Sequence, residues 1–262
     1  MTHPDMARIA AIHRYPVKGL SPEALLRVRL EPGQTLPSDR RYAIENGPSG
    51  FDPGEPKYFP KMRFLMLMRN ARLAELRTRF DDTTHILTIE HEGREAARGD
   101  LRTEDGRAAI EGFFAGFSAT ELRGPPKVLH APGHSFSDVA KKVVSIVNLA
   151  SVQDIERAIG APVDPLRFRG NLHVSDWPAW REFDLLGHTL VIGDAHLKVV
   201  KRIVRCAATE VDPATGIRDL EIPRTLMTRF GHADCGIYAE VVQGGRIAIG
   251  EELSAVEPPL PL

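Results

Sequence analysis

Cys206 is the residue whose type and neighbours point most directly to chemistry. It ends a strand-like run, residues 195–206, that carries three cations, Lys201, Arg202 and Arg205. Nearby cations lower the pKa of a thiol and favour the thiolate, the form that binds a soft metal or attacks an electrophile. The same pattern also fits an inert cysteine, because a lone cysteine at a strand end often packs as a small apolar residue.

Two arginines in the segment Arg167-Phe168-Arg169-Gly170-Asn171 suggest an oxyanion site. Strand alternation would point Arg167 and Arg169 the same way, and a guanidinium pair beside backbone N–H groups suits a phosphate. The alternative for this segment is a solvated or salt-bridged strand edge.

Further cations lie at the ends of predicted strands in the first half of the chain. Lys18 follows the first strand, and Arg40 and Arg41 open another. Each of them alone is typical of surface charge. Together they could face the mouth of a barrel that holds a polyanionic ligand.

Several other chemistries have no support in the sequence. His130 and His134 have the spacing of a helical zinc site but lie in a segment rich in proline and glycine. There is no Walker loop, no strand-anchored Gly-x-Gly-x-x-Gly and no glycine-flanked nucleophilic serine. The only other cysteine, Cys235, is taken as structural, with a transient Cys206–Cys235 disulfide left open. Two cysteines are also too few for an iron–sulfur cluster, which needs about four thiolates.

Charge and hydropathy limit the classes of partner that this protein is expected to bind. Among 262 residues, 34 Lys and Arg nearly balance 35 Asp and Glu, so no overall field favours nucleic acid or an anionic membrane. The first 20 residues lack the apolar core of a signal peptide, and no apolar run approaches the roughly 20 residues of a membrane span. We therefore expect a soluble, cytoplasmic protein with no nucleic acid and no membrane among its partners.

The elements that would position these residues are mostly strands. In the first part, alternation predicts strands at 9–17, 25–30, 41–44, 71–80 and 85–89, with a turn at 81–84 and a short buried helix at 60–70. A helix at 105–117 precedes the Gly124-Pro125-Pro126 break. In the second part, a strand at 143–147 leads to a helix that Ser151 caps and Gly160 ends. Further strands are predicted at 171–174, 188–192, 195–206, 235–242 and 246–249, with a hairpin turn at Gly244-Gly245.

Several of these segments, in this order, resemble the MOSC superfamily with its N-terminal β-barrel domain, which includes amidoxime-reducing components and the C-terminal part of molybdenum cofactor sulfurases. The segments are Tyr15-Pro16-Val17-Lys18-Gly19, Asp39-Arg40-Arg41-Tyr42, Arg167-Phe168-Arg169-Gly170-Asn171, Arg205-Cys206, Val211-Asp212-Pro213-Ala214-Thr215-Gly216 and Gly236-Ile237-Tyr238-Ala239-Glu240-Val241. The resemblance implies an α+β, strand-rich fold, in which an N-terminal β-barrel-like domain precedes a MOSC β-barrel domain with a few helices. The implied limits are 1–100 for the first domain, 101–125 for a helical connection, 126–255 for the MOSC domain and 256–262 for a tail.

The resemblance also implies a cofactor and a site. The cofactor is the molybdenum cofactor, Mo-molybdopterin, and Cys206 is carried over as the thiolate that binds molybdenum in amidoxime-reducing relatives. The residues implied to contact the cofactor, its phosphate or the cavity around it are Lys18, Arg40, Arg41, Asn148, Arg167, Arg169, Asn171 and Tyr238. Loops at 133–138 and 175–180 are expected to set substrate specificity.

The activity that the resemblance implies is reduction of N-hydroxylated or N-oxygenated small molecules. Some relatives carry a pyridoxal-phosphate-dependent desulfurase domain and others a ferredoxin domain, and this chain shows neither. We therefore expect electrons from a separate ferredoxin or flavoprotein reductase. Two alternatives stay open: a sulfur carrier or transferase that forms a Cys206 persulfide in cofactor maturation, and a non-catalytic cofactor-binding module.

Overall fold

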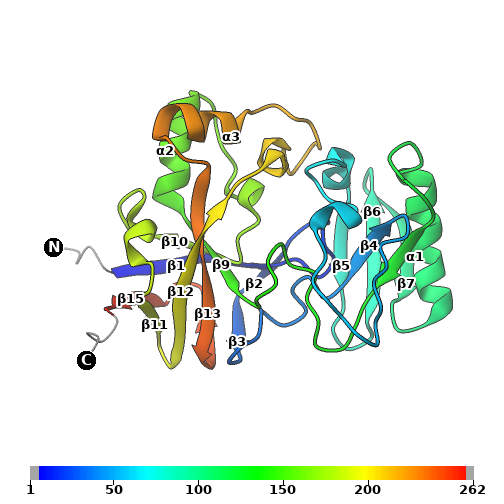
Figure 1. Ribbon diagram of the computed structural model, residues 1–262, viewed down its shortest axis with the longest axis horizontal. Coiled ribbons are helices and arrows are strands. Elements are labelled where there is room, and N and C mark those ends of the chain that lie inside the picture. Colours follow the sequence, from blue (N-terminus) through cyan, green and yellow to red (C-terminus); the bar gives the residue numbers. More distant parts are fainter. Residues whose placement is uncertain (1–5, 258–262) are drawn as a thin grey trace.

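Seven strands form a closed barrel in the computed structural model, which describes residues 6–257. Figure 1 shows this barrel beside the rest of the chain. The order of the strands around the barrel is β10, β9, β13, β12, β11, β15 and β1, and β1 pairs with β10 to close it. The pairs are antiparallel except β9 with β10. The bounds are β1 (Met6–Arg14), β9 (Val144–Asn148), β10 (Leu172–Ser175), β11 (Thr189–Ile192), β12 (Ala195–Val204), β13 (Asp234–Gln243) and β15 (Glu252–Val256).

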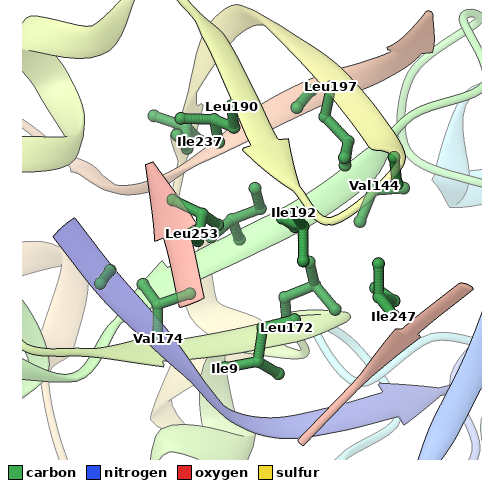
Figure 2. Close-up of a cluster of buried hydrophobic side chains, with 14 of the residues drawn as sticks. Ile9, Val144, Leu172, Val174, Leu190, Ile192, Leu197, Ile237, Ile247 and Leu253 are labelled. Carbon is green, nitrogen blue, oxygen red and sulfur yellow. The ribbon is translucent and has the colours of Figure 1, made fainter. Parts of the chain in front are cut away.

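Apolar side chains from all seven strands fill the barrel. Alternate residues of β1 and β12 are buried, as strand geometry requires when one face meets a core. Figure 2 shows Ile9, Leu172, Leu197 and Leu253 converging inside the barrel. Burial of each such side chain contributes about 1.5–3 kcal/mol. The barrel wall is therefore a rigid support for residues at its ends.

A second body of strands lies beside the barrel, with its own apolar core (Figure 1). It contains the pair β4 (Ala43–Asn46) and β8 (Pro126–Leu129) and the sheet of β5 (Arg77–Phe80), β6 (Ile86–His91) and β7 (Arg94–Asp100). Two further short strands, β2 (Glu23–Leu25) and β3 (Arg27–Leu30), connect β1 to this body. The predicted α+β, strand-rich class with a β-barrel and few helices is confirmed.

Three α-helices occur among the described residues: α1 (Glu104–Phe117), α2 (Leu149–Ile159) and α3 (Ile222–Thr225). The helix predicted at 105–117 is α1, whose N-cap Thr103 accepts a hydrogen bond from the Gly106 N–H at 3.0 Å. Shorter helical turns are η1 (Lys61–Arg63), η2 (Ala71–Glu75), η3 (Pro165–Phe168), η4 (Arg181–Leu185), η5 (Ala207–Glu210) and the π-helical η6 (Leu226–Phe230). No helix in residues 6–257 has both the length and the apolar character needed to cross a bilayer.

Two local predictions in the first half were wrong, and one strand was missed. The expected strand at 71–80 is instead the turn η2 followed by β5, and the expected buried helix at 60–70 is only the turn η1, none of whose residues is buried. Strand β7 was missed because Arg94 to Asp100 carries little apolar alternation. In these segments, packing against the second core determines the secondary structure more than the local apolar periodicity does.

The predicted N-cap of α2 and one predicted hairpin turn were also wrong. Ser151 lies inside α2, and the helix is capped by Asn148, whose side chain accepts from the Ala150 N–H at 3.1 Å. Gly244-Gly245 is not the turn of a β-hairpin. The strand that follows it, β14 (Gly245–Ala248), pairs with β3 and not with β13. A Cβ at residue 245 would lie 2.6 Å from the Ala195 nitrogen, so glycine is needed there for close backbone approach.

The first strand links the two bodies. β1 precedes the second body in sequence but is hydrogen-bonded to β15 and β10 of the barrel. The limits implied at 100, 125 and 255 stay predictions, and 258–262 of the expected tail lie outside the described residues. The barrel itself needs residues from both ends of the chain.

Candidate functional site

A cavity of about 250 Å³ lies between the barrel and the second body. One wall comes from segments at 18–19, 39–40 and 61–68, and the other from segments at 137–145, 167–171, 201–209 and 238. Seven of the predicted site residues line it: Lys18, Arg40, Arg167, Arg169, Asn171, Cys206 and Tyr238. Arg41 and Asn148 do not.

Cys206 lies where β12 gives way to η5. Its carbonyl accepts hydrogen bonds from the Thr209 N–H and Oγ1, both at 3.0 Å, which fixes the start of the turn. Its sulfur is partly exposed, and the Lys61 Nζ from the opposite wall donates to it at 3.2 Å. Lys61 was missed because it is 145 residues away in sequence.

Two of the three cations that precede Cys206, Arg202 and Arg205, contact other groups. The Arg205 guanidinium donates to the carbonyls of Cys235 and Phe168, each at 2.7 Å. The Arg202 guanidinium packs over the Phe183 ring, 4.3 Å from its centroid. Among the described residues, Lys61 is therefore the cation in hydrogen-bond contact with the sulfur.

Tyr15 forms a stack with two of the predicted arginines. Its ring is fully buried, and the guanidinium carbons of Arg40 and Arg169 lie 4.7 and 4.2 Å from its centroid. Arg40 is paired with Asp39 and donates to the Arg169 carbonyl at 3.0 Å. Burial lowers the pKa of Arg169 to about 10, with a smaller contribution from Arg40. Burial also raises the pKa of Tyr15 to about 12.

Asp138 joins two lysines at the rim. It is paired with Lys18 and lies 4.0 Å from the Lys61 Nζ. Burial alone would raise the pKa of Asp138, but the Lys18 and Lys61 ammonium groups outweigh it and hold the pKa at about 2. Burial lowers the pKa of Lys18, which also donates to the Phe136 carbonyl at 2.9 Å. Asp138 belongs to one of the two loops expected to set specificity.

Arg167 and Arg169 do not point the same way. Residues 165–168 form the turn η3 and Arg169 has left-handed backbone, so strand alternation does not apply. The Arg167 guanidinium is buried and paired with Asp212 at 3.1 Å and Asp219 at 2.8 Å. It lines the cavity, but its charge is compensated and it ties η3 to the loop after η5.

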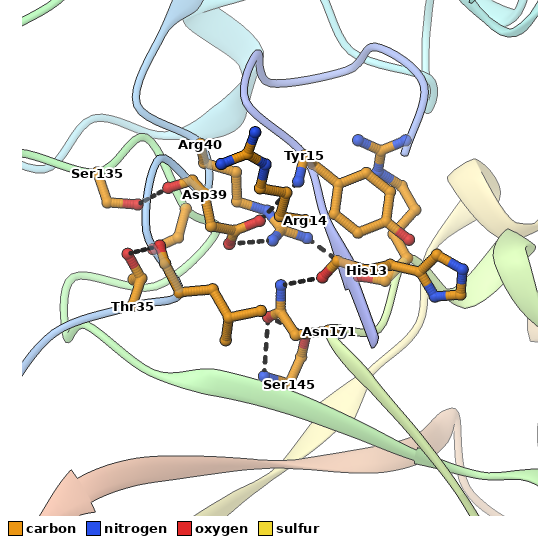
Figure 3. Close-up of polar contacts among 12 residues, drawn as sticks. His13, Arg14, Tyr15, Thr35, Asp39, Arg40, Ser135, Ser145 and Asn171 are labelled. Carbon is orange, nitrogen blue, oxygen red and sulfur yellow. Dashed lines mark hydrogen bonds and ion pairs between the residues drawn. The ribbon is translucent and has the colours of Figure 1, made fainter. Parts of the chain in front are cut away.

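Asn171 joins three strands of the barrel at the cavity wall (Figure 3). Its Oδ1 accepts from the Ser145 N–H at 3.1 Å and the Ser145 hydroxyl at 2.7 Å, and its Nδ2 donates to the His13 carbonyl at 3.1 Å. These bonds connect β10, β9 and β1. The amide therefore has a clear structural role in addition to its place at the cavity.

The two predicted residues outside the cavity have other partners. Asn148 is fully buried, caps α2 and donates to the Glu182 carboxyl group at 2.8 Å. The Arg41 Nε lies 3.4 Å from the His130 Nε2, in the second body. Cys235 is also buried, and burial raises its pKa to about 12. Both cysteines are free thiols.

The cavity is strongly cationic. Eight lysines or arginines line it, against the two carboxylates of Asp39 and Asp138. Within residues 6–257, four of them form no ion pair: Arg169, Lys201, Arg202 and Arg205. The same part of the chain has no cluster of three or more histidines, cysteines or carboxylates that could hold a metal. The arrangement suits an anionic ligand that also takes one soft sulfur donor.

Two family models together cover almost the whole described chain. Residues 131–254 match the MOSC domain, and residues 6–121 match the MOSC N-terminal beta barrel domain. The protein therefore belongs to the MOSC family, with the N-terminal domain preceding the MOSC domain. The resemblance drawn from the sequence motifs is confirmed.

Individual relatives are distant. Mitochondrial amidoxime-reducing component 1 of Mus musculus is 29% identical over 125 residues, which is 48% of this chain and 35% of that relative. Among solved structures, the YUAD protein of Bacillus subtilis is 12% identical with a TM-score of 0.45, and 95% of each chain is covered. YiiM of Geobacillus stearothermophilus is 23% identical with a TM-score of 0.36, over 45% of this chain and 55% of that one.

Proposed function

We propose that this protein binds the molybdenum cofactor in the cationic cavity and reduces N-hydroxylated small molecules, with electrons from a separate ferredoxin or flavoprotein reductase. The observation that carries the proposal is the position of Cys206, a partly exposed thiol on a cavity lined by eight cations. The partial match to an amidoxime-reducing component adds support for the substrate class.

The residues present fit such a cofactor. Thiolate sulfur is a suitable donor for a soft metal centre, and guanidinium and ammonium groups neutralise a phosphate. The Arg205 Nη2 is buried and has no hydrogen-bond partner, so one donor beside the cavity is uncommitted. Cys206 would hold the metal, and Arg169, Arg40 and Lys18 would neutralise the phosphate. When bound, the cofactor would supply the two-electron reduction of the N–O bond.

The chain's own residues would prepare the site. Lys61 keeps a positive charge against the Cys206 sulfur: burial disfavours that charge, but Asp138 and Cys206 outweigh it and raise the pKa of Lys61. Burial raises the pKa of Tyr238, so its hydroxyl stays protonated at the cavity and can donate to a substrate oxygen.

A second candidate rests on the same contact. The Lys61 ammonium 3.2 Å from a partly exposed sulfur would also stabilise the anion of a Cys206 persulfide. On this alternative the protein is a sulfur carrier in cofactor maturation. A module that binds the cofactor without turnover is the third candidate.

One purification separates the three. Protein from cells grown with molybdate is analysed for molybdenum and assayed for reduction of an amidoxime and an N-hydroxypurine by reduced methyl viologen. We expect close to one equivalent of molybdenum, and a loss of turnover of about 100-fold or more in Cys206→Ala. Cys235→Ala is the matched control and should keep turnover, because that thiol is buried in a separate apolar cluster.

The other outcomes are equally specific. Metal-free protein with an extra sulfur atom on Cys206, detected by mass spectrometry, would support the carrier. Tight cofactor binding without turnover would support the binding module. Protein that contains no molybdenum and binds no added cofactor would contradict the proposal.

A further inference from the structure

Arg40 and Arg169 share an unusual backbone conformation. Both have a φ of 51°, in the left-handed region that side chains other than glycine rarely adopt. Hydrogen bonds hold each in place: the Arg40 N–H donates to the Tyr15 carbonyl at 2.7 Å, and the Arg169 N–H donates to the Leu166 carbonyl at 3.1 Å. Strained backbone of this kind is maintained only where its surroundings fix it, and such positions cluster at functional sites.

The ring that both arginines contact is itself fixed. The Tyr15 N–H donates to the Asp39 Oδ1 at 2.8 Å, and its hydroxyl donates to the Gly170 carbonyl at 3.4 Å. Figure 3 shows Tyr15, Asp39 and Arg40 in one network at the end of β1. Gly170 directly follows Arg169, so Tyr15 is attached to both arginine-bearing segments.

The side chains of Arg40 and Arg169 differ in their hydrogen-bond partners. Arg40 uses its Nη1 on Asp39 and its Nη2 on the Arg169 carbonyl. Arg169 makes no side-chain hydrogen bond and no ion pair within residues 6–257, and its interaction is with the Tyr15 ring. Its N–H donors are therefore available to a ligand in the cavity that it lines.

We propose that Tyr15 is a positioning residue, whose ring holds the Arg169 guanidinium in the orientation that binds a phosphate oxyanion. The proposal deepens the proposed function and rests on it, because the anion would be the phosphate monoester of the cofactor. The negative face of the ring offsets repulsion between the two guanidinium groups and leaves the edge of the Arg169 guanidinium free for hydrogen bonds. Arg40 contributes by donating a hydrogen bond to the Arg169 carbonyl, which helps to fix the Arg169 backbone.

The test uses the full chain without cofactor and inorganic phosphate as the probe, titrated calorimetrically at low ionic strength. Tyr15→Leu keeps an apolar side chain but removes the ring, and we expect phosphate to bind about tenfold more weakly. Tyr15→Phe keeps the ring and should bind within about twofold of the original protein. Arg169→Ala should abolish measurable binding.

Tyr42→Leu is the matched control for stability. Tyr42 is also buried, but its ring packs on His130 with centroids 5.0 Å apart, and it is not among the residues that line the cavity. We expect this variant to melt at a lower temperature and to bind phosphate normally. If Tyr15→Leu does not fold, Tyr15→Met replaces it, because its flexible side chain adapts to the same space.

Three outcomes would overturn the inference: unchanged phosphate affinity in folded Tyr15→Leu or Tyr15→Met, an equal loss in Tyr42→Leu, or no phosphate binding by the original protein. The molybdenum content and turnover assays judge the proposed function separately. A protein that contains molybdenum and turns over, with Tyr15→Leu binding phosphate normally, would contradict only the role of Tyr15.

Discussion

His173 is a buried base in the barrel wall, where its charged form is disfavoured. It is 4% exposed, its Nε2 has no hydrogen-bond partner, and its ring lies 4.9 Å from that of His13. Burial lowers its pKa to about 3, with smaller contributions from His13 and Arg205. The unfolded chain therefore takes up a proton on this residue between about pH 6.5 and pH 3 that the folded protein does not.

This pKa shift predicts the pH dependence of stability. Because the unfolded state binds more protons in that window, the free energy of unfolding falls as the pH falls from 7. The contribution of His173 at pH 5 is about 2 kcal/mol. Urea unfolding at pH 7 and pH 5 should show this loss in the original protein and a smaller loss in His173→Leu. Equal losses in both proteins would contradict the assignment to His173.

Helix α1 packs against β7 through two glycines. A Cβ on Gly106 would lie 2.2 Å from the Asp100 carbonyl oxygen, and a Cβ on Gly99 would lie 2.1 Å from the Gly106 oxygen. A Cβ on Gly112, in the same helix, would meet no atom within 4 Å. The helix therefore contains one glycine required by close approach, Gly106, and two that packing does not require, Gly112 and Gly116.

We predict opposite effects of the same substitution at these positions. Gly112→Ala should stabilise the protein by about 0.5–1 kcal/mol, the usual difference in helix propensity. Gly106→Ala should destabilise it by about 2 kcal/mol or more, because backbone atoms must move apart. Chemical unfolding of the two variants measures both values. A stable Gly106→Ala protein would show that α1 does not pack this closely on β7.

At the scale of the whole molecule, the barrel depends on a strand from the start of the chain. β1 pairs with β15 through Met6 and Ser254 and with β10 through Ile12 and Leu172. Without β1, both neighbouring strands would present open edges, which favour aggregation. A fragment of residues 126–257 should therefore be aggregated or unfolded when measured by circular dichroism and size-exclusion chromatography.

A rearranged fragment provides the control. β1 runs antiparallel to β15, and Met6 lies opposite Ser254, so residues 6–14 can be fused after Val256 through a short turn. This fragment should recover the far-ultraviolet spectrum of a folded β protein. If the fragment without residues 6–14 were monomeric and cooperatively folded, the proposed role of β1 would be wrong.

The sequence by itself determined the strand-rich class, the helix at α1, the family and the position of Cys206 at a strand end. These features depend on local patterns: alternation in β12, apolar spacing in α1, and ordered motifs such as Tyr15-Pro16-Val17-Lys18-Gly19. Local patterns are readable without the fold because strand and helix periodicity act over a few residues.

Only the tertiary structure decided which cation contacts the Cys206 thiol and which cations are paired with carboxylates. Lys61 reaches Cys206 across the cavity, whereas Arg167, which strand alternation placed beside Arg169, is buried against Asp212. The structure also joined Tyr15 to Arg169 and closed the barrel with β1. These contacts link residues more than 40 positions apart, where side-chain direction depends on backbone turns and packing that no local period encodes.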